Sequence, residues 1–305
     1  MTRTYRLLIS CPDSTGIVAT VSDFIASHGG WIVEANHHSD PVTGRFYMRN
    51  GIKAESLPFS VDQFKEHFTP IAKKLSIDWR VNDSEIPLRV ALLASKEAHC
   101  LSDLLYRWRS GDLKIEIPCV ISNHEDLKSY VEWHGIPYHH VPVDKDDKIP
   151  AFEKVTQLLE EYCIDVVVLA RYMQILPPQL CDLYPNRIIN IHHSFLPSFV
   201  GAKPYHQAYE RGVKLVGATC HYVTEILDAG PIIEQDVIRV GHHIPEDMVR
   251  LGKDVEKSVL SRGLRYHIED RVIVDGSKTS STIHCEHWVQ RVQLTYPPSL
   301  EVGLA

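Results

Sequence analysis

The chain has 305 residues, of which 44% are hydrophobic and 23% charged, as is ordinary for a globular protein with a buried core. Its length predicts two domains. The net charge of −7 argues against a nucleic-acid partner and against binding to an anionic membrane. No apolar run approaches the roughly 20 residues that a membrane span needs. The seven cysteines form no CxxC pair, their number is odd and most lie in apolar runs, which together indicate a reducing cytoplasm.

The first 84 residues predict a small α+β domain with the ferredoxin-like order βαββαβ. Strands are expected at residues 6–10, 31–36, 45–49 and 77–80, and helices at residues 17–28 and 61–75. The first of these helices carries its apolar residues on one face, and Gly29 and Gly30 end it. Residues 82–87 are expected to link this domain to the next.

From Leu88 onward, apolar strands alternate with helical stretches. The strands are expected at residues 88–94, 115–121, 137–141, 164–170 and 187–191. This alternation predicts a Rossmann-like α/β domain over residues 85–283, with a mostly parallel sheet covered on both faces. An antiparallel part at residues 217–240 and a helix at about 245–269 complete it. Residues 284–305 have no clear pattern and form an extension of unknown role.

Three polar residues predict a site for acyl transfer. Asn190 and His192 end a buried strand and point to the same side, because strand side chains alternate between faces. In sheets of this kind, ligands bind at the carboxyl ends of the strands. Asp228 stands on a turn that continues with Gly230 and Pro231. An amide donor, an imidazole and a carboxylate supply an oxyanion partner, a proton donor and a base. The alternative is an ordinary strand end and an ordinary turn residue.

Two kinds of ligand are disfavoured. The first strand-to-helix turn, residues 94–100, holds no glycine, whereas phosphate-binding turns need glycines so that backbone amides can close on the phosphate. Eighteen histidines suggest metal binding, but the chain has neither an HExxH motif nor the spacing of a zinc finger. We therefore expect no metal.

The site segments resemble the folate-dependent formyltransferases. The resemblance lies in residues 172–176, 190–199, 203–208, 217–223 and 228–233, within a likeness that runs from about residue 5 to 283. It is strongest to the formyltetrahydrofolate deformylases. His193 stands where glycinamide ribonucleotide transformylases usually have proline, and residues 95–100 replace their glycine-rich turn. We expect residues 95–100 and His193 to wall a small cavity beside Asn190. Residues 1–84 resemble an ACT domain.

The resemblance implies hydrolysis of 10-formyltetrahydrofolate to formate and tetrahydrofolate, a step in one-carbon supply linked to purine biosynthesis. It implies a cytoplasmic homo-oligomer without metal or organic cofactor, because the folate is itself the substrate. Catalysis falls on Asn190, His192 and Asp228. His221 and His193 are expected beside these three residues, without contact to the reacting atoms.

The folate is expected to contact one apolar segment. The resemblance assigns this role to Met173, Gln174, Ile175 and Leu176, and a segment with apolar side chains and exposed backbone groups suits a flat pteridine. The alternative is plain packing at the start of a helix. Lys203 is a cation that lies between the two site fragments, and its role stays open.

The ACT-like domain is expected to bind a small amino acid at Asp13, Gly16 and Ile17, because backbone amides at a helix start can hold a carboxylate. The alternative is a purely structural dimerisation domain. Two alternatives to the hydrolase also stay open: a formyltransferase that acts on an amine, and a regulatory amino-acid-binding protein without catalysis. The intact set of Asn190, His192 and Asp228 argues against the second.

Overall fold

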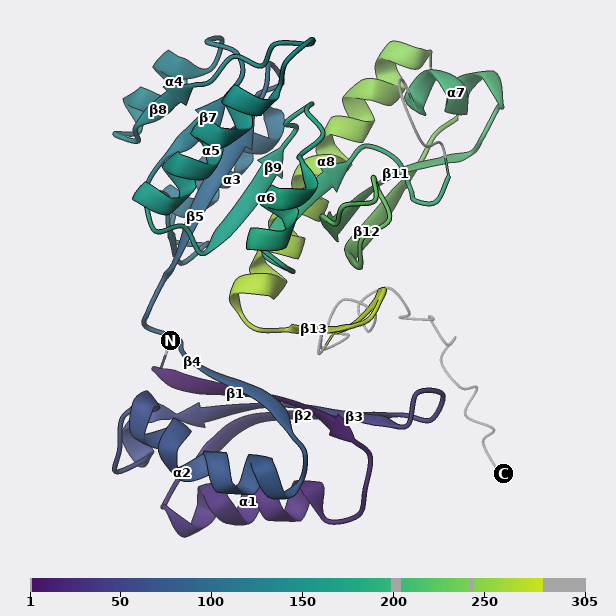
Figure 1. The fold of residues 1–305 in the computed structure, drawn as a ribbon. Coiled ribbons are helices and arrows are strands. Elements are labelled where there is room, and N and C mark those ends of the chain that lie inside the picture. Colours follow the sequence, from purple (N-terminus) through teal and green to yellow (C-terminus); the bar gives the residue numbers. More distant parts are fainter. Residues whose placement is uncertain (1, 199–203, 242–243, 282–305) are drawn as a thin grey trace, which may run out of the picture.

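The computed structural model describes residues 2–198, 204–241 and 244–281. Figure 1 shows a smaller unit, formed by the N-terminal part of the chain, beside a larger one. The smaller unit contains β1 (Thr4–Pro12), α1 (Ile17–Ser27), β2 (Ile32–Asp40), β3 (Arg45–Lys53), a 3-10 turn (Ala54–Ser56), α2 (Val61–Lys74) and β4 (Asp78–Asp83). Its strands form an antiparallel sheet in the order β2-β3-β1-β4. This is the predicted βαββαβ order.

Strand β2 is longer than the sequence predicted. It continues past residue 36 to Asp40, which pairs with Arg45 of β3. Residues 37–40 are polar, and β2 lies at the edge of the sheet, where most of them are solvent-exposed. Backbone pairing therefore extends the strand where the hydrophobic pattern gives no signal.

The larger unit is built on an eight-stranded, mostly parallel sheet. Its strands are β5 (Leu88–Ala94), β6 (Ile115–Glu116), β7 (Val120–Ser122), β8 (Tyr138–His140), β9 (Val166–Ala170), β10 (Ile188–His192), β11 (Leu215–Tyr222) and β12 (Ile232–Arg239). The order is β12-β11-β10-β9-β5-β7-β8, with β6 also paired to β5, and β11 and β12 run antiparallel to their neighbours. The predicted strand 115–121 is two strands, because Pro118 lies between them and has no N–H for the ladder.

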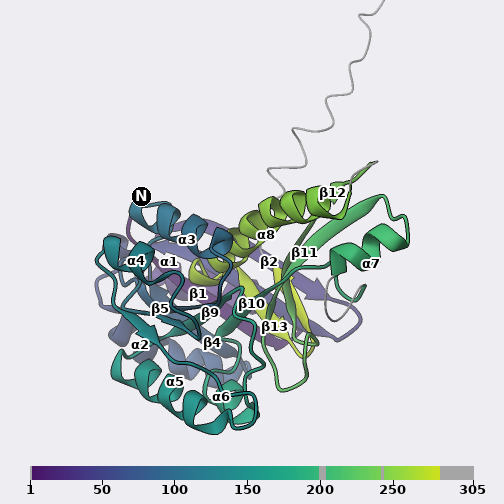
Figure 2. The same cartoon turned by 90° about the horizontal axis from the view of Figure 1, so that it is seen from above.

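Helices cover both faces of this sheet. They are α3 (His99–Arg109), α4 (Lys128–Trp133), α5 (Ile149–Glu161), α6 (Pro178–Leu183), α7 (Pro204–Glu210) and α8 (Pro245–Ile268), and a hairpin of β13 (Val272–Asp275) and β14 (Lys278–Ser281) follows α8. Figure 2 shows α3 and α8 on one side of the strands and α5 and α6 on the other. Each side has its own hydrophobic core. Helix α8 packs on β10 and β11, the strands that carry the predicted site.

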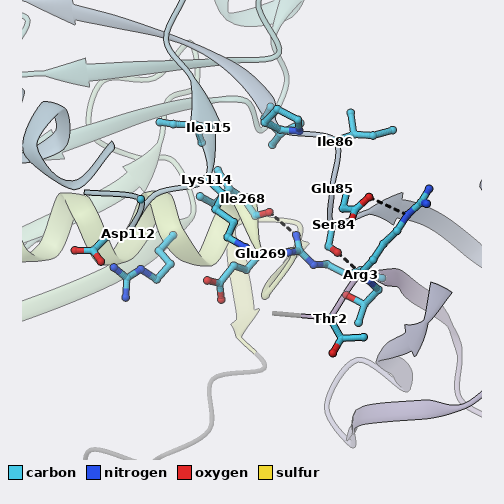
Figure 3. A pocket seen from close by; sticks show the side chains of 16 residues that line it. Thr2, Arg3, Ser84, Glu85, Ile86, Asp112, Lys114, Ile115, Ile268 and Glu269 are labelled. Carbon is cyan, nitrogen blue, oxygen red and sulfur yellow. Dashed lines mark hydrogen bonds and ion pairs between the residues drawn. The ribbon is translucent and has the colours of Figure 1, made fainter. Parts of the chain in front are cut away.

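The two units meet at the end of α8. The open face of the N-terminal sheet, opposite α1 and α2, turns towards β13, where Leu8, Tyr47 and Ile273 are buried together (Figure 1). Arg6 donates a hydrogen bond from Nη1 to the carbonyl of Ile268 over 2.7 Å. A cavity of about 550 Å³ lies in the same junction and is lined from both units (Figure 3). Among the described residues, no helix is long and apolar enough to cross a membrane.

Candidate active site

Strand β10 places two of the predicted catalytic residues. Ile189 and Ile191 face the core under α3 and α8, so Asn190 and His192 face the opposite side of the sheet. The strand lies between β9 and β11, near the point where the strand order reverses around β5. Asn190 and His192 therefore stand at the carboxyl end of a buried strand, close to the position where such sheets bind ligands.

The turn after β11 brings Asp228 to this strand end. The turn folds back on β11, and the backbone N–H of Tyr222 donates to the carbonyl of Pro231 over 2.9 Å. A Cβ at Gly230 would lie 1.8 Å from the carbonyl oxygen of Tyr222, so only glycine fits here. Asp228 has a positive φ of 55°, a conformation that aspartate adopts more readily than most residues.

His192 and Asp228 contact each other at the centre of the site. Nδ1 of His192 lies 3.2 Å from Oδ1 of Asp228, and both side chains are largely buried. The hydrogen bond from His192 holds the pKa of Asp228 below its ordinary value, so the carboxyl is ionised at neutral pH. Nε2 of His192 is buried and has no hydrogen-bond partner among the described residues. This nitrogen is therefore available to a bound substrate.

Asn190 is oriented by His221, which faces it across the β10–β11 ladder. Nδ1 of His221 lies 2.8 Å from the carbonyl of Tyr222, so this nitrogen carries the ring proton. The other nitrogen, Nε2, then accepts from the amide nitrogen of Asn190 at 3.1 Å. Burial lowers the pKa of His221 and keeps the ring neutral. His221 thus fixes the Asn190 amide as a donor, and the second amide hydrogen remains for a substrate oxygen.

These residues line a cavity of about 370 Å³, a volume within the usual range for small-molecule sites. Asn190, His192, His193, His221 and Asp228 all contribute to its wall. All four residues of the predicted folate segment contribute as well: Met173, Gln174, Ile175 and Leu176. The structure therefore brings the three predicted catalytic residues and the predicted folate segment together around one cavity.

The folate segment is a loop between β9 and α6, and it does not start a helix. Met173 and Ile175 are 57% and 60% exposed, although both are large and apolar. Ser95 supports the loop because its hydroxyl accepts from the backbone N–H of Met173 over 3.1 Å. Plain core packing explains Leu176, which is buried, but not the two exposed side chains. Exposed apolar residues beside a cavity are typical of a ligand site.

Next to His193 lies a buried polar network that the sequence did not predict. Its centre is Glu256 in α8, which is 1% exposed. The carboxylate accepts from Nε2 of His99 over 2.8 Å and from the hydroxyl of Tyr205 over 2.7 Å, and its Oε2 lies 3.4 Å from Nε of Arg171. Burial opposes its ionisation, but the hydrogen bond from His99 and the charge of Arg171 lower the pKa of Glu256. The group is therefore a buried, ionised carboxylate.

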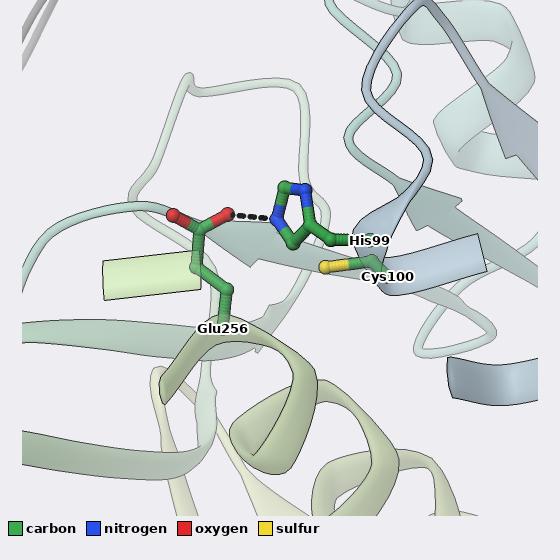
Figure 4. Close-up of side chains that lie close together, drawn as sticks. All are labelled: His99, Cys100 and Glu256. Carbon is green, nitrogen blue, oxygen red and sulfur yellow. Dashed lines mark hydrogen bonds and ion pairs between the residues drawn. The ribbon is translucent and has the colours of Figure 1, made fainter. Parts of the chain in front are cut away.

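His99, Cys100 and Glu256 are close enough together to be considered as metal ligands (Figure 4). Their chemistry fits a hydrogen-bond network better. Both carboxylate oxygens of Glu256 already accept hydrogen bonds, and the positive charge of Arg171 lies beside them. Burial raises the pKa of the Cys100 thiol well above its ordinary value, which opposes the thiolate that a metal binds. That no metal takes part in the reaction stays a prediction.

One expectation about the cavity was wrong. None of residues 95–100 lines it, although His193 does. The reason is that helix α3 begins at His99 and turns this side chain away to Glu256, while Ser95 supports the folate loop from outside. Burial, with the charge of Arg171, lowers the pKa of His193 to about 4, so the ring that reaches the cavity is neutral.

The predicted effector turn has a mixed outcome in the structure. Gly16 starts α1 with a φ of 90°, and Asp13 accepts from the hydroxyl of Ser39. The side chain of Ile17 is buried in the core of the N-terminal unit, so only its backbone could reach a ligand. Lys203 and residues 284–305 lie outside the described residues.

Comparisons with known proteins agree with this fold. Residues 88–264 match the family described as formyl transferase, so the larger unit defines the class of the protein. Glycinamide ribonucleotide transformylase 1 from Symbiobacterium toebii has a similar structure, with a TM-score of 0.60 and 29% identity, and the match covers 64% of this chain and 94% of that one.

The relatives that match along most of the chain have one name. Formyltetrahydrofolate deformylase from Bacillus subtilis (strain 168) is 49% identical over 276 residues, which cover 90% of this chain and 92% of that protein. The crystal structure of a formyltetrahydrofolate deformylase from Pseudomonas syringae pv. tomato str. DC3000 has a TM-score of 0.91 and 65% identity, and the match covers 92% and 95% of the two chains. The chain belongs to the formyltetrahydrofolate deformylase family.

Proposed function

We propose that the protein hydrolyses 10-formyltetrahydrofolate to formate and tetrahydrofolate, with Asn190, His192 and Asp228 as its catalytic residues. The observation that carries this proposal is the contact of His192 with Asp228, which stands beside an oriented Asn190 amide in a cavity of about 370 Å³. The family relationship to formyltetrahydrofolate deformylases supports the substrate.

The first step is the attack of water. The water oxygen bonds to the formyl carbon, and the electron pair of the carbonyl moves onto the formyl oxygen. Asn190 donates its second amide hydrogen to this oxyanion, and such a donor contributes about 10²–10³-fold to the rate. Asp228 takes the proton of the water, directly or through a second water. It is suited to this role because its lowered pKa keeps it ionised.

The second step breaks the bond between the formyl carbon and N10 of the folate. The oxyanion reforms the carbonyl, and N10 leaves with a proton from Nε2 of His192. Before the attack, when Asp228 is still ionised, its Oδ1 lies 3.2 Å from Nδ1 and stabilises the positive charge of the ring. The proton held by Asp228 then restores the imidazolium, and the formic acid releases its own proton as formate. A proton donor of this kind contributes about 10²–10⁴-fold.

The folate itself is expected to lie against Met173 and Ile175, whose exposed side chains offer an apolar surface to a flat ring. Apart from the N–H of Met173, which donates to Ser95, the backbone groups of the same loop lie outside any helix and can meet the pteridine edge. The proposal assigns no metal and no organic cofactor to the reaction, because the folate is the substrate.

A direct assay tests this proposal: the purified protein is mixed with 10-formyltetrahydrofolate in the absence of any amine. We expect formate and tetrahydrofolate in equal amounts, and no rate increase on addition of glycinamide ribonucleotide. In the variant His192→Ala, the activation free energy of hydrolysis is expected to rise by several kcal/mol, since proton donation to N10 and stabilisation of the oxyanion are both lost. Formate that appears only when an amine is supplied would identify a transferase instead.

We also propose that residues 1–84 are an ACT domain that binds a small amino acid near Asp13 and Gly16 and pairs with the same domain of another copy. The βαββαβ order and the left-handed backbone of Gly16 support this assignment. Calorimetry against the common amino acids, with no heat and no rate change, would leave only a structural role. We further propose a cytoplasmic location, which the free thiols of the six described cysteines support, and a role in one-carbon supply to purine biosynthesis.

A further inference from the structure

Arg171 occupies a backbone position that suits glycine. It directly follows β9 and has a φ of 64°, a conformation that costs free energy for residues with a Cβ. The side chain at this strained position is long and charged, yet only 14% exposed. A strained residue that persists at the edge of a ligand cavity suggests a function for its side chain.

Side chains from three helices hold this guanidinium in place. Glu256 of α8 lies 3.4 Å from Nε of Arg171 and is itself fixed by His99 of α3 and Tyr205 of α7. Gly252, one turn before Glu256 in α8, makes room for Tyr205, because a Cβ at Gly252 would lie 2.1 Å from the hydroxyl oxygen. Residues of three helices therefore fix the side chain of Arg171 in one position.

Arg171 and His193 line the same cavity as the catalytic residues. Nε and Nη1 of Arg171 are buried and make no hydrogen bond within the described part of the chain. The cavity wall thus includes a positively charged residue with unsatisfied N–H groups, and the catalytic residues line the same space. The ring of His193 packs against the ring of Tyr205, with ring centroids 6.2 Å apart.

A wall of this kind distinguishes water from an amine. The oxygen of water has two lone pairs, so it can accept a hydrogen bond from an N–H while its other pair attacks the formyl carbon. A neutral amine has a single lone pair, which the attack uses. One of its N–H groups can donate to Asp228, but no lone pair is left to accept a hydrogen bond from Arg171. A protonated amine has no lone pair and is repelled by the guanidinium.

We propose that Arg171 selects water over an amine as the nucleophile, and that Glu256 is the positioning residue that holds Arg171 in place. This inference rests on the proposed hydrolysis. When water attacks, its oxygen bonds to the formyl carbon, the bond to N10 breaks, N10 gains a proton and formate leaves. When an amine attacks, its nitrogen bonds to the same carbon and loses one proton to Asp228, N10 gains one, and a formylated amine leaves.

The test is a competition assay on the full-length chain with 10-formyltetrahydrofolate and increasing glycinamide, in which formate and formylglycinamide are both measured. The variant is Arg171→Gly, which removes the guanidinium and relieves the strained backbone. The matched control is Cys163→Gly, because Cys163 has a similar φ of 48° but is exposed and outside the cavity lining. Wild type and control are expected to release formate only.

In Arg171→Gly, formylglycinamide is expected to appear in proportion to glycinamide, and its ratio to formate should rise at least about tenfold, the scale of one discriminating contact. A change in this ratio is not expected from a merely structural role. Since removal of Arg171 leaves the charge of Glu256 without its ion pair, the double variant Arg171→Gly with Glu256→Gln is tested as well. The substitution Glu256→Gln keeps a side-chain oxygen for Tyr205 but removes the charge.

Two results would overturn the inference. The first is a folded variant that binds folate and releases formate alone at every glycinamide concentration. The second is the loss of both products in the single and the double variant with folate binding intact, because Arg171 would then take part in catalysis and not in selection. Failure of the proposed hydrolysis looks different, since the wild type itself would then release no formate without an amine.

Discussion

Replacement of Asp228 by asparagine is the sharpest mutation that the site offers. Asparagine adopts the left-handed backbone as readily as aspartate does, so the φ of 55° at Asp228 is kept without strain. The new side chain has nearly the same shape but carries no charge. In the wild type, Nδ1 of His192 lies 3.2 Å from Oδ1 of Asp228, and the amide of asparagine can still face this nitrogen. The amide can neither take a proton from water nor stabilise an imidazolium.

The expected cost in kcat is at least about 10²-fold and up to about 10⁴-fold, the range for a catalytic base. Folate binding should persist, because the apolar loop of the cavity is untouched. The assay is steady-state formate release, with folate affinity from fluorescence quenching and thermal unfolding as a check on folding. Asn186→Gly serves as the control, since Asn186 has a φ of 54° outside the lining of the catalytic cavity.

The pH profile adds a second measure. The hydrogen bond from His192 lowers the pKa of Asp228 below its ordinary value of 3.8, so the carboxylate persists as pH falls through 5. Loss of activity between pH 7 and 5 therefore should not come from protonation of Asp228. A variant Asp228→Asn that keeps more than about a tenth of the wild-type kcat would refute Asp228 as the base.

Two further predictions concern stability. Burial lowers the pKa of His267 from 6.5 to about 4, so between these values the unfolded chain binds a proton that the native chain does not. The free energy of unfolding should thus fall as pH falls through this window, by up to about 1.4 kcal/mol per pH unit. Urea titrations at several pH values should find a weaker dependence of this free energy on pH in His267→Gln. An equal pH dependence in wild type and variant would contradict this. Gly263→Ala would place a Cβ 2.4 Å from Sγ of Cys220 and should cost about 1–3 kcal/mol, which Cys220→Ala should partly restore in the double variant. Thermal unfolding that is unchanged in Gly263→Ala would show that α8 does not pack on β11 this closely.

Strand periodicity was sufficient to predict the relation of Asn190 and His192. A buried strand presents alternate side chains to one side, and the parallel sheet puts its carboxyl end at the ligand edge. The approach of Asp228 to His192 could not be predicted in this way. It depends on the turn at Gly230, which folds back against Tyr222, and such long-range contacts leave no periodic signal.

The network of Glu256 was missed for a related reason. A glutamate in a long helix is ordinarily a solvated residue, and the partners of this one come from other helices. One signal was present in the sequence. Gly252, Glu256 and Leu260 lie four residues apart, so the glutamate falls on a helix stripe of small and apolar residues, and all three are buried. A charge on such a stripe indicates a buried partner.

Strand boundaries failed where backbone pairing, and not side-chain burial, decides the structure. Pro118 splits the predicted strand at 115–121, and edge strand β2 continues through polar residues to Asp40. The wall expected from residues 95–100 failed because the sequence does not indicate where α3 starts. Helix α3 begins at His99, and the side chain of this residue therefore turns towards α8 and away from the cavity.

The origin of the second formate oxygen tests the central claim most directly. The protein is mixed with 10-formyltetrahydrofolate in water enriched in ¹⁸O, without an amine, and the formate of a single turnover is analysed by mass spectrometry. Hydrolysis at Asn190, His192 and Asp228 predicts formate that keeps the formyl oxygen and gains one ¹⁸O from water, together with free tetrahydrofolate. Formate without ¹⁸O, or no formate until an amine is added, would contradict attack by water at this site.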